Sequence, residues 1–145
     1  MSPDRPCRDS PGGPQRVWGE AWYGPSGTDW VFTGTLRFPG DLIATFDCGT
    51  ALVERDELEA LGDAGSLFLD DPWHCNVPVI ELRREGELER IELEPLDSYR
   101  LELENMSDAI RGEAELLLGR DDATGQARTL EALHRSATTG VPVSL

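Results

Sequence analysis

The chain has 145 residues, 39% of them hydrophobic, which suits one domain with a core and leaves no room for a second full domain. Its 28 acidic residues outnumber the 13 basic ones and give a formal net charge of -15, so we expect no nucleic-acid partner and no anionic membrane partner. Every basic residue is an arginine, and this excludes mechanisms that need a lysine, such as Schiff-base chemistry.

The cysteines and the hydropathy bear on the compartment of the protein. Cys7, Cys48 and Cys75 are widely spaced and form no CxxC motif, so we expect neither a disulfide framework nor a zinc site. The N-terminus lacks the apolar core of a signal peptide, and no apolar run approaches the roughly 20 residues that span a bilayer. The sequence therefore favours a soluble protein of the reducing cytoplasm.

The beginning of the chain differs in composition from the rest. Residues 1–15 contain four prolines and two glycines and almost no large apolar side chain, which predicts a disordered leader. We expect one ordered domain over residues 16–145.

The first ordered half has the period-two pattern of β-strands. We expect a strand over residues 16–24, followed by two alternating runs over 29–48 around a Pro39-Gly40-Asp41 turn. In these runs Phe32, Gly34, Leu36 and Phe38 share one face, and so do Leu42, Ala44, Phe46 and Cys48. Asp47 lies on the face opposite Phe46, where we expect a solvated side chain.

The same pattern continues to about residue 94. Gly62 and Gly65 bracket a turn before a short strand at Ser66 to Leu69, and residues 78–94 form a hairpin that turns at Glu85-Gly86. These strands predict an antiparallel meander.

Helical periodicity begins only after the strands. Tyr99, Leu103, Met106 and Ile110 lie on one face of a helix over residues 97–112, which Asp97 or Ser98 caps at the start and Gly112 at the end. We expect these four side chains to face the sheet. A second helix over 122–138 places Ala127, Leu130, Leu133 and Ala137 on one side and ends at Gly140, and the last five residues return as a strand.

The fold class that follows is α+β, with a predominantly antiparallel open β-sheet and two C-terminal-half α-helices packed on one face. The other face of the sheet stays uncovered in this arrangement. Because monomers seldom expose a large contiguous apolar patch, we expect a homo-oligomer formed through the uncovered sheet face.

Two histidines could carry chemistry. His74 stands beside Asp70, Asp71 and Cys75 and could belong to a metal cluster or an acid–base pair, but neighbours on one loop rarely converge on an ion, so we interpret it as a loop residue. His134 lies in the second helix, where we expect it to flank the packed side or to complement the helix end. We therefore assign no catalytic residue and no metal ligand.

The aromatic residues are more distinctive. Trp18, Trp22 and Trp30 fall close together and, with Tyr23, could form an aromatic wall for a sugar or another flat ligand. Packing in the core or at an interface explains them equally well, so both interpretations stay open at this point.

Four segments carry a specific resemblance when they are taken in order. They are "TGTLRFPGDLIATFDCG", "LEALGDAGSLFLDDPW", "YRLELENMSDAIRG" and "TLEALHRSATTGVPVSL". Together they resemble the C-terminal domain of the glucose-fructose oxidoreductase and inositol dehydrogenase family, known as Gfo/Idh/MocA. The resemblance runs from about Gly12 to Leu145.

The resemblance implies a two-domain NAD(P)-dependent enzyme, with a Rossmann domain first and a substrate-binding, oligomerising sheet domain second. The family's nucleotide fingerprint and catalytic lysine lie upstream of the matching region and carry over to no residue here. We therefore expect no cofactor in this chain itself and NAD or NADP only with a Rossmann partner or domain. Whether this chain is a fragment, a truncated gene product or a free-standing relative stays open.

Two functions compete on this basis. The first is a substrate-binding and oligomerisation domain of an oxidoreductase-like protein, not catalytic alone, which pairs with itself or with a separate Rossmann subunit. The alternative is a small repurposed lyase or isomerase that acts on a sugar-like ligand in a pocket at the sheet margin. The residues that we expect to line a substrate pocket are Trp22, Tyr23, Trp30, Asp97 and Tyr99.

Overall fold

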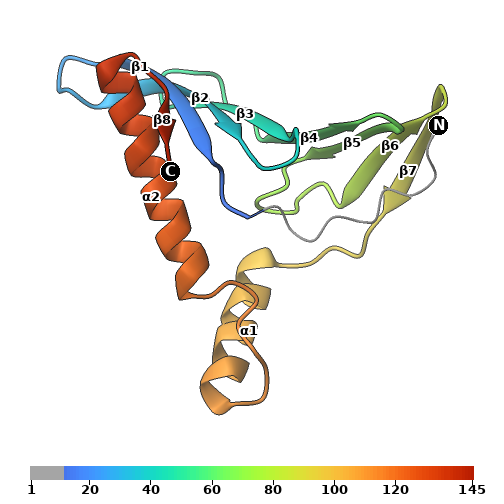
Figure 1. Ribbon diagram of the computed structural model, residues 1–145. Helices are drawn as coiled ribbons and strands as arrows, with labels where there is room; N and C mark the ends of the chain where they lie inside the picture. The colour runs from blue at the N-terminus through green and yellow to red at the C-terminus, as the bar shows by residue number, and fades with distance from the viewer. Residues whose placement is uncertain (1–11) are drawn as a thin grey trace. The chain divides into compact units, whose positions relative to one another are not determined.

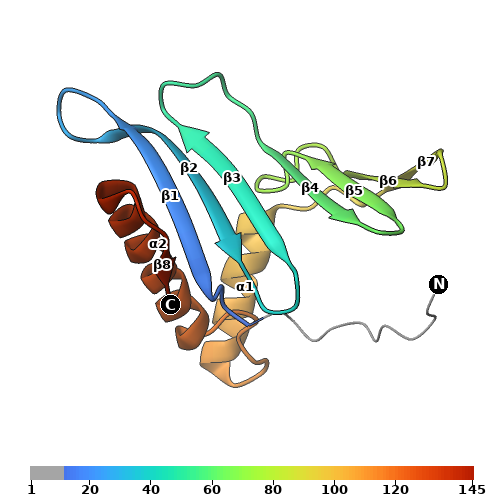
Figure 2. The ribbon, with the colours of Figure 1, turned by 45° about the horizontal axis from the view of Figure 1, so that its top comes forward.

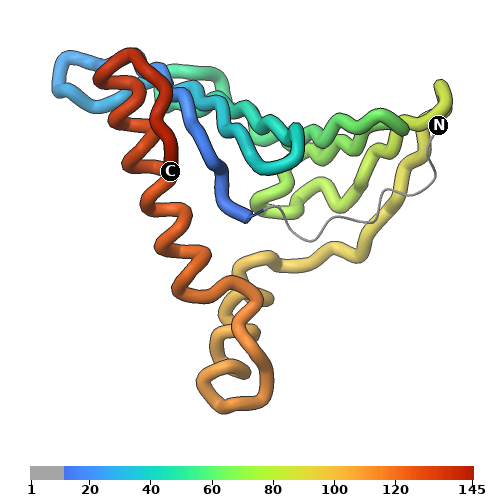
Figure 3. The backbone as a smooth tube through the Cα atoms, viewed as in Figure 1, coloured from blue at the N-terminus to red at the C-terminus, as the bar shows by residue number. Residues whose placement is uncertain are grey.

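The structure, a computed structural model, describes residues 12–145, so most of the expected leader lies outside the described residues. Within the described part, Gln15 already donates its backbone N–H to the carbonyl oxygen of Arg37. The chain divides into two compact units: one combines the stretch up to Leu52 with Leu118–Leu145, and the other is Val53–Leu117. Figure 3 traces the path, which leaves the first unit after its third strand and re-enters it through the last helix.

The first unit contains an antiparallel sheet with the strand order β3-β2-β1-β8 (Figures 1 and 2). Its strands are β1 (Arg16–Tyr23), β2 (Asp29–Arg37), β3 (Ile43–Gly49) and the short β8 (Val143–Ser144). The predicted turn joins β2 to β3, with Gly40 and Asp41 both at positive φ, a conformation that glycine and aspartate tolerate better than most residues.

The alternation expected for these strands defines an inner and an outer face of the sheet. Val17 and Phe32 are buried on the inner face and, with Val143, form the core together with residues of the last helix. Trp18, Thr33 and Thr35 point the other way and are exposed on the outer face. One face of the sheet thus packs, while the outer face stays bare within this unit.

Helix α2 (Arg120–Thr139) packs on the inner face. It ends at Gly140, as expected, with that glycine in the left-handed conformation. Its buried residues are Ala132, Leu133 and Ser136, so the helix is rotated relative to the stripe predicted from the sequence, and Leu130 is half exposed.

A close approach of backbones explains this orientation of α2. A Cβ atom on Gly19 would collide with the carbonyl oxygen of Leu133, so only a glycine lets the helix lie this close to β1. The hydroxyl of Ser136 accepts the backbone N–H of Gly19 at 3.1 Å and donates to the carbonyl of Val141 at 2.8 Å. A polar contact therefore decides which side of α2 is buried.

The inner face is covered only in part. An open groove of about 510 Å³ lies beside the N-terminal half of α2. Leu36, Phe38, Phe46 and Leu130 are among the apolar residues that line it, and Asp121 is at its edge. One helix is too narrow to cover the inner face of this sheet completely.

The second unit is an antiparallel meander followed by a helix. Its strands are β4 (Glu57–Gly62), β5 (Gly65–Asp70), β6 (Val79–Arg84) and β7 (Glu87–Glu92), in the order β4-β5-β6-β7. Glu85 and Gly86 both have positive φ in the predicted turn between β6 and β7. Helix α1 (Ser98–Arg111) begins at the predicted cap Asp97 and ends at Gly112.

The α+β class, the antiparallel strands and the two helices in the C-terminal half are confirmed. The arrangement differs in two respects from the one expected. The strands form two sheets of four, since β3 and β4 share no ladder pairing. The side chains of Tyr99, Leu103, Met106 and Ile110 are 48% to 79% exposed, so the expectation that they pack on the sheet is wrong for α1. Helix α2 does pack on a sheet, but through a side that is rotated from the predicted stripe.

Candidate functional site

The outer face of the first sheet presents side chains in rows that cross three strands. The strand register aligns Trp18 of β1 with Thr35 of β2 and Thr45 of β3, and we call this set the Trp18 row. On one side of it lies the Arg16 row, and on the other side lies the Glu20 row. The Arg16 row consists of Arg16, Arg37 and Ile43, and the Glu20 row of Glu20, Thr33 and Asp47.

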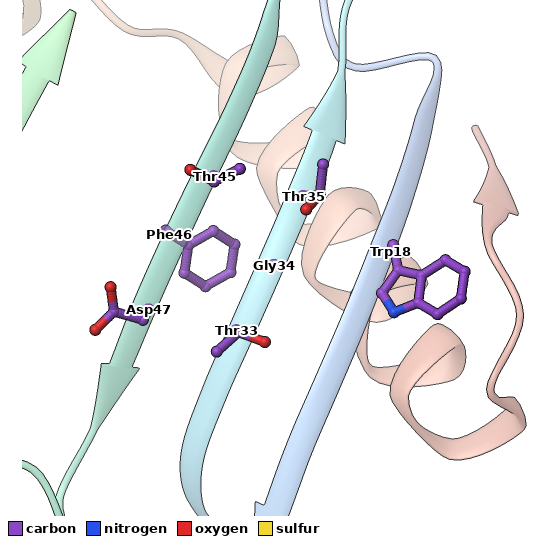
Figure 4. A pocket seen from close by; sticks show the side chains of 7 residues that line it. All are labelled: Trp18, Thr33, Gly34, Thr35, Thr45, Phe46 and Asp47. Carbon is purple, nitrogen blue, oxygen red and sulfur yellow. The ribbon is translucent and has the colours of Figure 1, made fainter.

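A shallow hollow of about 280 Å³ lies on this face (Figure 4). Its lining residues are Trp18, Thr33, Gly34, Thr35, Thr45, Phe46 and Asp47. Gly34 and Phe46 belong to inner-facing positions and form the floor, while the threonines and Asp47 stand around it. Such a hollow suits a ligand with a polar group on an apolar stem. The threonine hydroxyls and the carboxylate can hydrogen-bond the polar group, and the indole of Trp18 can contact the apolar stem.

The expected aromatic group lies further along the same unit. Trp22 and Trp30 meet edge to face, with ring centroids 5.8 Å apart and an interplanar angle of 78°. Gly24 permits this arrangement, because a Cβ there would collide with the indole of Trp30. Trp22 is 60% exposed and Tyr23 is also exposed, so core packing does not account for them and the open alternatives are a ligand or an interface.

A second cluster of polar groups lies in the second unit. Nδ1 of His74 is 2.7 Å from Oδ1 of Asp71 and 3.9 Å from Oδ2 of Asp56. Asp71 has a positive φ and also accepts the backbone N–H groups of His74 and Asn76. His74 is therefore more than a plain loop residue, because its ring is oriented by a carboxylate.

The electrostatics of this pair follow from its hydrogen bonds. The bond to Asp71 raises the pKa of His74 above its ordinary value, helped by the charges of Asp71, Asp56 and Glu54 and opposed by partial desolvation. Desolvation raises the pKa of Asp71, but hydrogen bonds from His74 and Asn76 outweigh it and leave that pKa lowered. Both shifts favour an ion pair.

Among the residues that the structure describes, Asp56, Asp71 and His74 form the group whose side chains could together hold a metal ion. Asp56, Asp71 and His74 each offer one ligand atom, and these atoms lie within 4.8 Å of one another. One imidazole and two carboxylates suit a divalent first-row metal. Both oxygens of Asp71, however, already accept hydrogen bonds from its own loop, which explains the cluster without an ion.

The two expected site residues of the second unit lie near this loop. Asp97 caps α1, since its Oδ1 accepts the backbone N–H of Arg100 at 3.1 Å. The ring of Tyr99 is 6.4 Å from that of His74, and the hydroxyl of Ser98 donates to the carbonyl of Trp73. Asp97 thus has a structural role, and Tyr99 adds an exposed ring beside the His74 pair.

The structure brings some of the predicted residues together and adds others. Trp22 and Trp30 meet in the first unit, whereas Asp97 and Tyr99 belong to the second. Sequence reasoning missed Thr33, Thr35 and Asp56. The alternating Thr33-Gly34-Thr35 segment could have indicated a polar outer face with a hollow at the glycine, which has no side chain. Asp56 gave no such signal, because it is too far from His74 in sequence for the spacing to link the two residues.

Neither of the two helices in the described part of the chain has the length and hydropathy needed to cross a bilayer.

Comparison with known proteins gives relatives among oxidoreductases. No family model matches the chain. An uncharacterized oxidoreductase of Rhizobium meliloti, ORF334, is 30% identical over 136 residues, which cover 88% of this chain and 41% of that protein. The chain therefore spans about two fifths of the length of this relative.

Solved structures share the fold. An aldose-aldose oxidoreductase from Caulobacter crescentus, crystallised with glycerol, superposes with a TM-score of 0.81 at 21% identity, over 92% of this chain and 42% of that one. An oxidoreductase from Agrobacterium radiobacter, in complex with NAD+, L-tartaric acid and magnesium, gives a TM-score of 0.72 at 14% identity, over 92% of this chain and 44% of that one. The chain thus has the fold of one part of larger oxidoreductases.

Proposed function

The resemblance of this chain to the C-terminal domain of Gfo/Idh/MocA-type oxidoreductases is confirmed, and from it we propose that the chain is a substrate-side and self-association domain of an NAD(P)-dependent oxidoreductase-like protein. In this proposal nicotinamide binding belongs to a Rossmann partner or domain, and this chain supplies contacts to substrate and to a second copy of itself. The protein would act in the cytoplasm, on a sugar or polyol.

The single observation that carries the self-association role is the bare outer face of the first sheet. The inner face packs against α2, while Trp18 and Trp22 on the outer face are 46% and 60% exposed, with Ile43 exposed on the same face. Large aromatic side chains exposed together on a sheet are typical of surfaces that bind a partner.

The substrate role is supported by the kind of side chain at the predicted positions. Trp22 and Trp30 form a rigid aromatic pair that suits the apolar faces of a sugar ring, and Tyr23 follows directly. The relative from Caulobacter crescentus is an aldose-aldose oxidoreductase crystallised with glycerol, a polyol. We therefore propose a polyhydroxylated small molecule as the substrate class.

The self-association role can be tested by measuring molar mass in solution. Static light scattering of the chain at up to about 100 µM should give a dimer, with association strengthened as salt rises. Salt screens the long-range repulsion between two copies that carry a net charge of -15 each, and it leaves the apolar contacts intact.

A pair of tryptophan variants localises the effect. Trp18→Ala should weaken the dimer, because a large aromatic anchor is lost from the outer face. Trp73→Ala is the matched control, since Trp73 is 58% exposed but lies in the second unit, and it should leave the dimer intact. A strict monomer at both low and high salt would contradict the proposal.

A further inference from the structure

Two aspartates meet where the ladder between β4 and β5 ends. Asp56 directly precedes β4 and Asp71 directly follows β5, and the backbone N–H of Asp71 donates to the carbonyl oxygen of Asp56 at 2.7 Å. The antiparallel pairing of the two strands therefore holds the two residues side by side. Strand register, and not spacing in the sequence, brings these two carboxylates together.

A single turn of the chain returns His74 to the same place. The backbone N–H of Cys75 donates to the carbonyl oxygen of Asp71 at 3.0 Å and closes this turn. Nδ1 of His74 then lies 2.7 Å from Oδ1 of Asp71 and 3.9 Å from Oδ2 of Asp56. One nitrogen and two carboxylate oxygens, each from a different residue, thus lie within 4.8 Å of one another.

Hydrogen bonds inside the loop account for only part of this arrangement. They hold His74 and Asn76 against Asp71 without any ion. Asp56 is different, because its carboxylate makes no hydrogen bond within the described part of the chain and its contact with His74 is too long to be one. The side chain of Asp56 is only 36% exposed and faces a second carboxylate. Two close carboxylates repel each other, and a positive ion between them relieves that repulsion.

We propose that Asp56, Asp71 and His74 bind a divalent first-row transition-metal ion such as Zn²⁺, with His74 ligating through Nδ1. An imidazole nitrogen favours such an ion over Mg²⁺ and Ca²⁺, which prefer oxygen ligands, and the two carboxylates balance its charge. All three residues belong to the second unit, so the inference is independent of the proposed self-association.

The distances are close to those that such an ion needs. Two ligand atoms that are each about 2.1 Å from a tetrahedral zinc ion lie about 3.4 Å apart. The 2.7 Å contact of Nδ1 is shorter than this and the 3.9 Å contact is longer, so a small shift of the imidazole from Asp71 towards Asp56 suits both. His74 is 46% exposed, which leaves its ring room for that shift. The ion replaces the proton between Nδ1 and Asp71, and this proton is released to solvent.

The number of ligands indicates the class of metal site. Structural zinc sites are closed by four protein ligands, whereas three protein ligands leave a position for water or for a ligand oxygen. Asp56, Asp71 and His74 supply three, and the exposed His74 keeps the group accessible. The ring of Tyr99, 6.4 Å from that of His74, borders it. The site is therefore of the open class.

Titration calorimetry with Zn²⁺ tests the proposal on the whole chain. We expect a single ion to bind with a dissociation constant of about 1 to 100 µM, and Mg²⁺ and Ca²⁺ to bind at least about 10-fold more weakly. Asp56→Asn and His74→Gln should each weaken Zn²⁺ binding by at least about 10-fold, because each removes one ligand atom. Circular dichroism checks that every variant is folded.

Two matched controls separate ligation from other causes. Asp70→Asn removes a charge next to the group but no ligand atom, and it should leave the affinity within about threefold. Cys75→Ser removes the neighbouring thiol and should likewise have little effect. A readout that needs no variant is the NMR spectrum, in which stoichiometric Zn²⁺ should shift the ring signals of His74 and leave those of His134 in place.

Three results would overturn the proposal. The first is the absence of binding at Zn²⁺ concentrations up to about 1 mM. The second is an equal loss of affinity in Asp70→Asn and Asp56→Asn, which would mean that the acidic surface attracts the ion without ligating it. The third is binding that Cys75→Ser abolishes and Asp56→Asn leaves unchanged, which would assign the ion to the thiol.

Discussion

At the scale of single residues, Ser136 determines how the helix meets the sheet. It is completely buried, and its hydroxyl bridges the backbone N–H of Gly19 and the carbonyl of Val141. A buried serine is tolerated only where both its donor and its acceptor are used, as they are here. The sequence pattern gave no sign of it, because periodicity arguments place only apolar residues in a core.

Ser136→Ala should therefore lower the free energy of unfolding by about 1 to 3 kcal/mol, since it leaves the buried N–H of Gly19 and the part-buried carbonyl of Val141 without their partner. Thr138→Ala is the matched control: its hydroxyl donates to the carbonyl of His134 on the exposed side of α2, and its loss should change stability by less than about 0.5 kcal/mol. Urea unfolding followed by circular dichroism measures both. Equal effects of the two substitutions would contradict the bridging role.

His74 should titrate above its ordinary pKa of 6.5, because the hydrogen bond to Asp71 stabilises the imidazolium. The stabilisation that this bond gives to the loop is fully present below pH 6.5 and is lost as the pH rises through the raised pKa of the folded protein. NMR titration of the ring protons measures the shift, with a His134→Gln variant to assign the signals.

Two substitutions identify the cause of that shift. Asp71→Asn should bring the pKa of His74 back down more than Asp56→Asn does, because Asp71 supplies the hydrogen bond and Asp56 only a weaker charge interaction. If both substitutions had the same effect, the pair at 2.7 Å would not be the main cause.

At the scale of elements, the two helices differ in the interactions that stabilise them: α2 is packed against a sheet, and α1 relies on its caps. Leu133 on α2 is 2% exposed, whereas Leu103 on α1 is 68% exposed. Helix α1 is defined by its caps: Asp97 at the start, and Gly112 at the end, where the N–H of Gly112 bonds to Ala109 O and that of Glu113 to Asp108 O.

Leu103→Ala should accordingly change the free energy of unfolding of this chain by less than about 0.5 kcal/mol, while Leu133→Ala should cost about 2 to 5 kcal/mol. Denaturant midpoints of the two variants test this directly. A cost for Leu103→Ala as large as that for Leu133→Ala would mean that the α1 stripe packs after all, as its spacing predicts.

Most of the elements, though not their packing, could be predicted from the sequence. Period-two runs and turn residues such as Glu85-Gly86 predict the β2–β3 and β6–β7 hairpins, because these signals are local. The amphipathic spacing of Tyr99, Leu103, Met106 and Ile110 predicts a helix correctly but does not say what covers its apolar side. The division of the strands into two sheets depends on non-local pairing, which no local pattern specifies.

The candidate site was predictable to a smaller extent. The aromatic cluster follows from composition, and Trp22 and Trp30 do meet. The polar rows of the outer face arise from the register between β1, β2 and β3, and a shift by one residue would bring different side chains into line. The pairing of His74 with Asp56 likewise needs the fold, because the loop and the residue before β4 approach only in three dimensions.

At the scale of the whole molecule, the outer face of the first sheet is the feature that links fold to function. The first unit devotes one face to its own core and leaves the other free. The balanced charges on that free face contrast with the net charge of -15 on the chain. The net negative charge of the chain opposes non-specific association, and the balanced charges on this face reduce that opposition locally.

The first unit is also discontinuous in sequence. Val17 pairs with Val143, and the hydrogen bond from Gly19 to Ser136 joins residues 117 positions apart. During synthesis β1, β2 and β3 leave the ribosome well before α2 and β8, so the side chains of Val17 and Phe32 lack their packing partners from α2 and β8 until the final segment emerges. Throughout that interval the nascent chain exposes an unsatisfied apolar sheet, and its yield in the cell will depend on how quickly translation finishes or on a chaperone that shields the inner face.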